Sequence, residues 1–339
     1  MKGILLFARV PMNVAYLKPI YLVLAGEASF WGTVKPSRGG VGGDLFSLQG
    51  VRVRHVPSWL APWLPLDIYL SSDIMVAGRR CRWKIHTFHG VSFKGRAYTP
   101  KVLAYDRLFV VGPYMERRFV EGGILKEGDP RIVRVGMPKL DPLVNGTWTQ
   151  NKTIEHLGLD RDATVVFYAP TWGAGSSLKA LGEAVMKTVL GLGLTLVVKL
   201  HDHTFRDPFW KEKVEEWEAA GAVIYRDPDI VPAMAASDLL ISDLSSVANE
   251  YLLLDRPLVY LAAPGYEKRY GETVDLETWG FAAGPLVEEK DQMKGALLDA
   301  LDHPQAYSEV RRKMAAHLFY NPGQATQRAV DVIRELLDG

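Results

Sequence analysis

Several predicted strands of this chain end in polar side chains that can do chemistry. The residues that follow these strands are His89, Thr171, His201 and the group Asp243, Ser245 and Ser246. Imidazole titrates near neutral pH, so the two histidines are candidates for a general base and for an acid or phosphate ligand. Ligands of parallel sheets bind at the carboxyl ends of the strands. We therefore expect these loops to build one site.

The stretch Ser237 to Tyr260 has the pattern strand, polar turn, helix, strand. Its turn places Ser245 and Ser246 at a predicted helix start, where unpaired backbone N–H groups and the helix dipole favour an anion such as phosphate. The alternative is that Asp243 or Ser245 simply caps the helix. The pattern by itself leaves both interpretations open.

Other chemistry has little support. His86 and His89, and His201 and His203, lack an HExxH or Cys/His set, so no metal site is predicted. The chain has no GxSxG elbow or Walker motif, its one cysteine has no catalytic context, and no cofactor is predicted. Ser176-Ser177 follows a small-residue loop, which fits either a second phosphate nest or a plain capped loop.

The elements that must position these residues alternate between strand and helix, which is typical of parallel sheets. A Pro-, Asn- and Thr-rich segment, Pro138 to Asn151, is the predicted linker. The predicted fold class is α/β, with two Rossmann-like domains facing across a cleft: residues 1–145, residues 146–318, and a C-terminal helix in 319–339 that packs back on the first domain. The strands expected from short apolar runs include 3–10, 51–56, 68–70, 74–76, 85–88, 108–111, 131–135, 164–168, 194–199, 222–225 and 239–241.

Composition narrows the class of protein further. The chain has 339 residues, 48% hydrophobic and 23% charged, with a net charge of +1. This balance predicts a globular protein and argues against a dedicated nucleic-acid binder, although Arg79 to Lys84 forms a local basic cluster. A single cysteine, Cys81, fits a reducing compartment, so a cytoplasmic location is expected. The most apolar long stretch, Ala15 to Phe30, contains Lys18, Pro19 and Glu27 and is not expected to span a membrane.

A set of motifs in one order resembles the CDP-glycerol glycerophosphotransferase family, the teichoic-acid primases and polymerases. The motifs run from about Phe88 to Arg328. They are HG at His89-Gly90, GMPKLD at Gly136 to Asp141, APTW at Ala169 to Trp172, KLH at Lys199 to His201, SDLSSVANEYLLLDRPLVY at Ser242 to Tyr260 and NPGQAT at Asn321 to Thr326.

The resemblance implies a GT-B-like fold and specific roles for matching residues. His89 corresponds to the base that activates the acceptor, and His201 to the second essential histidine, at the donor diphosphate. Ser245 and Ser246 correspond to diphosphate-contacting serines. The remaining expected contacts are Thr171 and Lys199 at the diphosphate, and Asp243, Glu250, Gln324 and Thr326 at the nucleotide.

The expected function is transfer of a polyol phosphate, glycerol phosphate first among them, from a CDP-linked donor to a polyol or lipid-linked saccharide acceptor. Such an acceptor implies attachment to the inner face of the cell membrane, for which Trp59, Trp63 and the basic cluster are candidates. Two alternatives stay open because fold does not fix function. One is a nucleotide-sugar glycosyltransferase or UDP-sugar epimerase, and the other is a non-catalytic nucleotide-binding module.

Overall fold

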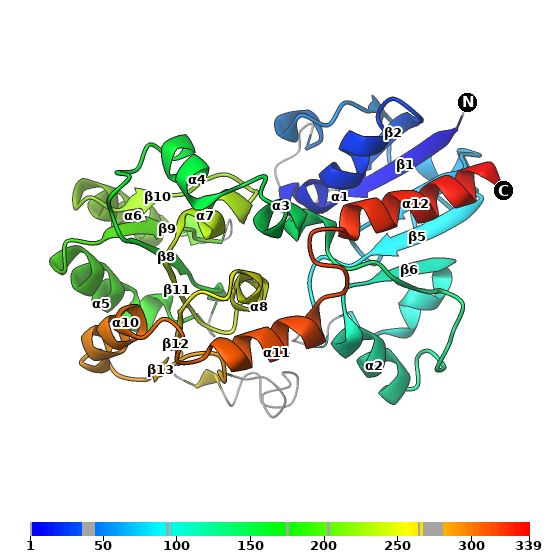
Figure 1. Cartoon of the computed structure of the whole chain (residues 1–339). Helices are drawn as coiled ribbons and strands as arrows, with labels where there is room; N and C mark the ends of the chain where they lie inside the picture. Colours follow the sequence, from blue (N-terminus) through cyan, green and yellow to red (C-terminus); the bar gives the residue numbers. More distant parts are fainter. Residues whose placement is uncertain are drawn as a thin grey trace. The chain divides into compact units, whose positions relative to one another are not determined.

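The chain forms two compact units, which are described separately (Figure 1). Unit 1 comprises Met1–Asn145 and His317–Gly339, and unit 2 comprises Gly146–Ala316. The computed structural model describes residues 2–35, 45–92, 95, 97–173, 176–201, 204–263, 265–266 and 281–339.

The described part of unit 1 contains a seven-stranded parallel sheet with the order β3-β2-β1-β4-β5-β6-β7. The order reverses between β1 and β4, and in doubly wound sheets such a switch point is where ligands bind. The strands are β1 (Gly3–Ala8), β2 (Ser29–Val34), β3 (Arg54–His55), β4 (Ile68–Ser71), β5 (Trp83–Thr87), β6 (Arg107–Val110) and β7 (Ile132–Arg134).

Two helices far apart in sequence cover one face of this sheet. Helix α1 (Pro11–Leu24) and the C-terminal helix α12 (Ala325–Asp338) lie side by side in Figure 1 and contact each other. Leu17 of α1 and Ile333 of α12 belong to one apolar core with Ile4 and Leu6 of β1. The last helix of the chain therefore completes the core that the first strand begins. The other helices of unit 1 are α2 (Pro113–Glu121) and the short α3 (Asp141–Val144).

Unit 2 repeats the same topology in its described residues, with a six-stranded parallel sheet in the order β10-β9-β8-β11-β12-β13. Here the order reverses between β8 and β11. The strands are β8 (Val165–Ala169), β9 (Thr195–Val198), β10 (Val223–Ile224), β11 (Leu239–Ser242), β12 (Leu258–Leu261) and β13 (Leu286–Val287).

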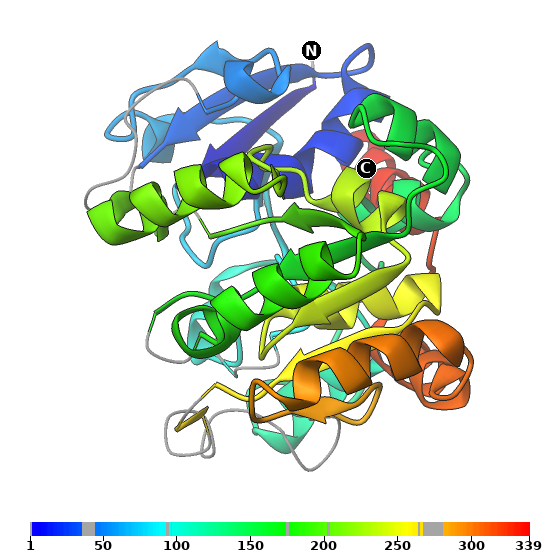
Figure 2. The same cartoon turned by 90° about the vertical axis from the view of Figure 1, so that its left-hand side faces the viewer.

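Three helices of unit 2 cover one face of its sheet, as Figure 2 shows: α5 (Leu178–Gly191), α6 (Pro208–Ala219) and α10 (Gln292–Asp302). Val185, Trp217 and Leu297 bring these helices into one buried apolar core with the strands. The remaining helices are α4 (Gln150–His156), α7 (Val231–Ala236), α8 (Ser246–Tyr251) and α11 (Ser308–Leu318), the last of which continues into unit 1.

The predicted α/β class with two Rossmann-like, GT-B-like domains is confirmed. The strand predicted at Ile74 to Val76 is wrong, because the chain folds back after β4 and Met75 N–H donates to the Asp73 carbonyl oxygen at 2.7 Å. The long strand predicted at Val51 to Val56 shortens to β3, while β2 was not predicted at all. No helix in the described residues is long and apolar enough to cross a membrane.

Candidate active site

The switch point of unit 2 is bridged by a buried carboxylate. Asp243 follows β11 and is 2% exposed. One of its oxygens accepts a hydrogen bond from Thr171 N–H at 2.8 Å, and the other accepts from Ser177 N–H at 2.8 Å and Oγ–H at 2.9 Å. Charge-assisted bonds of this kind are stronger than neutral ones. Asp243 therefore fixes the loop between β8 and α5 to the end of β11.

The two serine pairs, Ser176-Ser177 and Ser245-Ser246, differ in the hydrogen bonds of their hydroxyl groups. Ser177 turns its hydroxyl to Asp243, so the Ser176-Ser177 loop is held by internal bonds. Ser245 is the N-cap residue of α8, yet its side chain makes no capping hydrogen bond, and the Asp243 carboxylate is engaged with the β8–α5 loop. Ser245 is half-buried and Ser246 is exposed. The Ser245 side chain therefore does not cap α8, and the hydroxyls of Ser245 and Ser246 lie at the carboxyl edge of the sheet.

His201 lies beside an aromatic ring at the same edge. It follows β9, is half-buried, and its ring centroid is 5.4 Å from that of Trp172, with the planes 36° apart. Lys199 also follows β9, and its Nζ lies 6.0 Å from the centroid of the Tyr225 ring. Trp172 itself is 43% exposed. An imidazole, an ammonium group and an exposed indole thus come from loops that adjoin the switch point.

Glu250 lies in α8 and is 2% exposed, so its carboxyl group is buried rather than displayed on the surface. Asp202 and His203, which the sequence pattern placed beside His201, lie outside the described residues.

In unit 1, His89 lies just beyond the end of β5 and is exposed. Its Nδ1 is 2.7 Å from the Ser72 carbonyl oxygen, beyond the end of the neighbouring strand β4. A carbonyl oxygen only accepts, so Nδ1 must carry the proton and the lone pair of the neutral ring is on Nε2. The Tyr16 ring lies edge-on to His89, with centroids 6.3 Å apart. In this tautomer only Nε2 of the neutral His89 ring can accept a proton.

The GMPKLD and NPGQAT motifs bind each other within unit 1. The Asp141 carboxylate accepts hydrogen bonds from Ala325 N–H at 3.1 Å and Thr326 N–H at 2.6 Å, at the start of α12. The Thr326 hydroxyl donates to the Pro138 carbonyl oxygen at 3.3 Å. Gln324 is exposed. Thr326, expected at the nucleotide, therefore has its amide and hydroxyl engaged in holding α12.

Sequence reasoning missed Asn13 and Ser72, which are 3% and 0% exposed. They lie beyond β1 and β4, at the switch point of unit 1. The run of three polar residues after Leu70, Ser71-Ser72-Asp73, was the available signal, because the same strand-end rule that selected His89 applies there. Because residues 74–76 were predicted to be a further strand, Ser71 to Asp73 were not recognised as a strand end.

The Cys81 thiol does not suit nucleophilic chemistry. It is buried, and burial raises its pKa to about 11. Because the thiolate is the reactive form, a thiol that stays protonated at neutral pH is inert.

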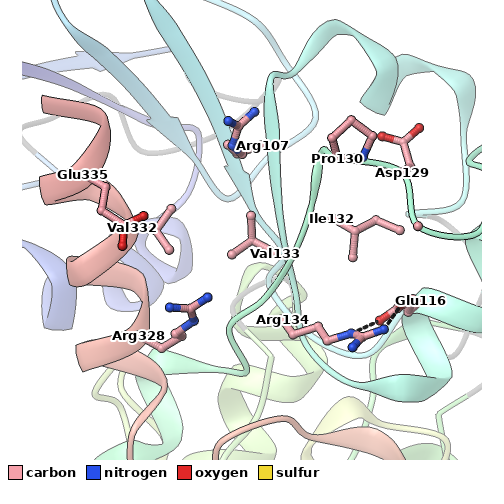
Figure 3. Close-up of a pocket in the computed structure, with 11 residues that line it drawn as sticks. Arg107, Glu116, Asp129, Pro130, Ile132, Val133, Arg134, Arg328, Val332 and Glu335 are labelled. Carbon is pink, nitrogen blue, oxygen red and sulfur yellow. Dashed lines mark hydrogen bonds and ion pairs between the residues drawn. The ribbon is translucent and has the colours of Figure 1, made fainter. Parts of the chain in front are cut away.

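A pocket of about 420 Å³ in unit 1 lies between β7 and α12 and contains none of the predicted site residues (Figure 3). Its walls carry three arginines and three carboxylates. Arg134 and Glu116 pair through two hydrogen bonds of 2.9 Å, which Figure 3 marks. Opposite charges balance in this pocket, and we assign it no function.

The described geometry defines a class of protein. Each unit is a doubly wound parallel sheet with titratable and hydroxyl side chains at its carboxyl edge, and this architecture is the GT-B-like fold. The chain belongs to the CDP-glycerol:poly(glycerophosphate) glycerophosphotransferase family, whose model matches residues 84–335. The resemblance seen in the sequence motifs is confirmed.

Relatives agree with this assignment. The teichoic acid glycerol-phosphate primase of Bacillus spizizenii is 27% identical over 253 residues, 71% of this chain and 61% of the primase. The teichoic acid glycerol-phosphate transferase of Staphylococcus aureus is 27% identical over 236 residues, 60% of this chain and 54% of the transferase. The chain thus spans little more than half the length of these curated relatives.

Solved structures show the fold. The wall teichoic acid polymerase TagF aligns with a TM-score of 0.75 at 19% identity, covering 99% of this chain and 89% of the TagF chain. MnaA of Staphylococcus aureus, solved with UDP, aligns with a TM-score of 0.64 at 14% identity, covering 100% and 97%.

Proposed function

We propose that this protein transfers glycerol phosphate, or a closely related polyol phosphate, from a CDP-activated donor to an acceptor hydroxyl in cell-envelope polymer synthesis. The observation that carries the proposal is the family match over residues 84–335, which contains His89, His201 and both serines. The orientation of His89, with Nδ1 held by a carbonyl oxygen, supports its role as the base.

The proposed reaction is a displacement at phosphorus. The acceptor oxygen attacks the phosphorus that carries glycerol, a new P–O bond forms, and the P–O bond to CMP breaks. His89 Nε2 takes the acceptor proton, and CMP leaves with the bonding electron pair. His201, Ser245 and Ser246 donate hydrogen bonds to the diphosphate, which stabilises the charge that develops on the leaving group.

The other contacts expected at the donor divide into two kinds. We assign Thr171 and Lys199 to the diphosphate, and Glu250 and Gln324 to the nucleotide. Asp243 acts on the donor through the β8–α5 loop that it holds, because its oxygens already accept three hydrogen bonds. Thr326 acts through α12 in the same way, because its hydroxyl donates to Pro138.

We assign residues 1–145 to the acceptor and residues 146–318 to the nucleotide donor. The nucleotide side is supported by the switch point of unit 2, where the Ser245 side chain makes no capping hydrogen bond and Ser246 is exposed. The acceptor side is supported by His89 at the corresponding edge of unit 1. The C-terminal helix α12 belongs with the acceptor unit, since it completes that unit's core.

An acceptor on a lipid carrier would bring the protein to the inner face of the membrane. Trp59 and Trp63 are 73% and 62% exposed, and the Arg80 guanidinium lies 5.4 Å from the centroid of the Trp63 ring. Exposed indoles beside guanidinium groups suit the interface of an anionic bilayer, where the aromatic ring is buried and the cation meets lipid phosphate. We therefore propose peripheral attachment through this surface.

Flotation with phosphatidylglycerol-containing vesicles tests the attachment. The protein should float with anionic vesicles at low salt, and the double variant Trp59→Ala/Trp63→Ala should lose most of that binding. Phe209→Ala, which removes an exposed ring from unit 2, is the matched control. Equal flotation of all three proteins would contradict the assignment.

Product analysis tests the reaction. With CDP-glycerol and a synthetic lipid-anchored glycerol-phosphate acceptor, the protein should release CMP and extend the acceptor by one glycerol phosphate. Release of a nucleoside diphosphate from a nucleotide sugar, without CMP from CDP-glycerol, would favour the glycosyltransferase or epimerase alternative. Binding of CDP-glycerol without turnover of any acceptor would favour the non-catalytic module.

A further inference from the structure

The switch point of unit 1 is bridged by a buried amide, as that of unit 2 is bridged by Asp243. Asn13 lies in the first turn of α1, and its Oδ1 accepts hydrogen bonds from Arg9 N–H at 3.0 Å and Val10 N–H at 3.1 Å. Its Nδ2 donates to Ser72 Oγ at 3.0 Å, beyond the end of β4. The side chain thus joins the β1–α1 turn to the loop that follows β4.

Ser72 connects this amide to His89. Its hydroxyl accepts from Asn13, and its main-chain carbonyl oxygen lies 2.7 Å from His89 Nδ1. Asn13 and Ser72 are both buried, while His89 is exposed. Two hydrogen bonds, joined through the covalent frame of Ser72, therefore connect the interior of unit 1 to the imidazole.

Such a connection has two effects on a base. It sets the tautomer, because a carbonyl oxygen at Nδ1 leaves the lone pair on Nε2. It also sets the ring position, and a displacement of about 1 Å at a reacting group can cost roughly a hundredfold in rate. Buried polar networks whose members are all bonded are rigid, so they suit this task.

We infer that Asn13 and Ser72 are positioning residues that fix the orientation and tautomer of His89. The inference rests on the proposed function, since it takes His89 to be the base. Neither residue touches the reacting atoms. Asn13 holds the Ser72 segment in place, and the Ser72 carbonyl oxygen holds the imidazole.

The test uses three variants of the full chain. Ser72→Ala removes the hydroxyl that Asn13 bonds to and leaves the Asn13 bonds to Arg9 and Val10 intact. Asn13→Ala removes the bond to Ser72 as well as the bonds to Arg9 and Val10. The double variant completes a double-mutant cycle. Thr149→Ala is the matched control: it removes a capping side chain, which accepts from Lys152 N–H, from α4 in unit 2.

Two measurements are made on each variant. The first is the steady-state rate of CMP release from CDP-glycerol with the synthetic acceptor. We expect kcat to fall about tenfold in Ser72→Ala and about ten- to a hundredfold in Asn13→Ala, with KM for CDP-glycerol changed less than about twofold. The double variant should be no slower than Asn13→Ala, because the two residues act through one connection. The control should retain wild-type kcat.

The second measurement is the nitrogen NMR spectrum of His89, which needs no turnover. The neutral imidazole should carry its proton on Nδ1 in the wild type, and a fraction with the proton on Nε2 should appear in Ser72→Ala and Asn13→Ala. Unchanged tautomers in both variants would overturn the inference, as would kcat values within about twofold of wild type. Failure of the proposed function can be distinguished from failure of this inference. A fully active His89→Ala would show that His89 is not the base, whichever tautomers the NMR spectra show.

Discussion

At the scale of single residues, His86 is a buried imidazole that the proposed reaction does not use. It is fully buried on β5, and neither ring nitrogen has a hydrogen-bond partner among the described residues. Its ring lies 4.4 Å from that of Phe88 and 4.9 Å from that of Tyr105, centroid to centroid. Burial, and secondarily the proximity of His89, lower the pKa of His86 from 6.5 to about 3.

This burial predicts acid sensitivity. Between pH 6.5 and pH 3 the unfolded chain binds a proton at this imidazole that the folded chain excludes, so the free energy of unfolding falls as the pH falls through 6.5. Above that range the group is neutral in both states and contributes no pH dependence. The loss at pH 5 should be about 2 kcal/mol. Urea unfolding of wild type and His86→Leu at pH 7 and pH 5 measures it.

In His86→Leu the loss of unfolding free energy between pH 7 and pH 5 should be smaller by that amount. At pH 7 the variant should unfold within about 1 kcal/mol of wild type, because leucine removes two unsatisfied nitrogens. An identical pH dependence of the two proteins would show that His86 is not the source.

At the switch point of unit 2, replacing Asp243 should reduce both the stability of the protein and its binding of CDP-glycerol. Replacing the two serines should reduce the binding alone. Asp243→Ala leaves buried N–H groups unpaired and should lower the thermal midpoint by roughly 5–10 °C while weakening CDP-glycerol binding. Ser245→Ala with Ser246→Ala should weaken CDP-glycerol binding about tenfold or more with the midpoint nearly unchanged. Calorimetric titration and thermal unfolding of both proteins measure this. Loss of folding in the double serine variant would make the serines structural.

At the scale of elements, two of the motifs that resemble the family form one structural contact. Asp141 caps α12 through Ala325 and Thr326 N–H, and Gly136 has a φ of +97° with the Tyr320 carbonyl oxygen 2.0 Å from where a Cβ would lie. Glycine alone adopts that conformation without strain and leaves room for that oxygen. These residues dock the C-terminal helix on unit 1.

Asp141→Ala should therefore reduce stability more than catalysis. Loss of the cap should cost about 1–2 kcal/mol, and α12 should lose protection from hydrogen exchange before the rest of unit 1. Hydrogen exchange with mass spectrometry, on peptides covering 325–338 and peptides from unit 2, makes the comparison. Uniform loss of protection in both units would contradict a local role.

The elements that the sequence predicted well are the buried parallel strands. Strands β8 and β11 are apolar runs that end in polar residues, so the pattern located Thr171 and Asp243. Strand β2 was missed because Gly32 interrupts its apolar pattern. That glycine is needed where a Cβ would lie 2.4 Å from the Val53 side chain.

The hydrogen bonds within the site could not be predicted from the sequence pattern. Asn13 and Ser72 are 59 positions apart, and Asp243 reaches back 72 positions to Thr171. No local periodicity encodes such pairs, because they arise only when the sheet order brings the strand ends together. The pattern therefore located polar strand ends, while the structure showed that Asp243 bonds to its own chain.

At the scale of the whole molecule, the two units share one structural feature at their switch points. In each, a buried polar side chain joins the two strand ends at the switch point: Asn13 to Ser72 in unit 1, and Asp243 to Thr171 and Ser177 in unit 2. In unit 1 the bridge leads to His89, the proposed base, and in unit 2 it holds a loop beside His201. The proposed reaction uses groups from both units, so we predict that loss of His89 alone or of His201 alone abolishes transfer.

The most direct measurement is the rate of CMP release from CDP-glycerol, with the synthetic acceptor present, by wild type and His89→Ala followed by phosphorus NMR. The account predicts that the wild type forms CMP and a new phosphodiester in equal amounts. It predicts that His89→Ala slows both by a hundredfold or more while still binding CDP-glycerol. Wild-type CMP release by His89→Ala, or no CMP from the folded wild type, would contradict it.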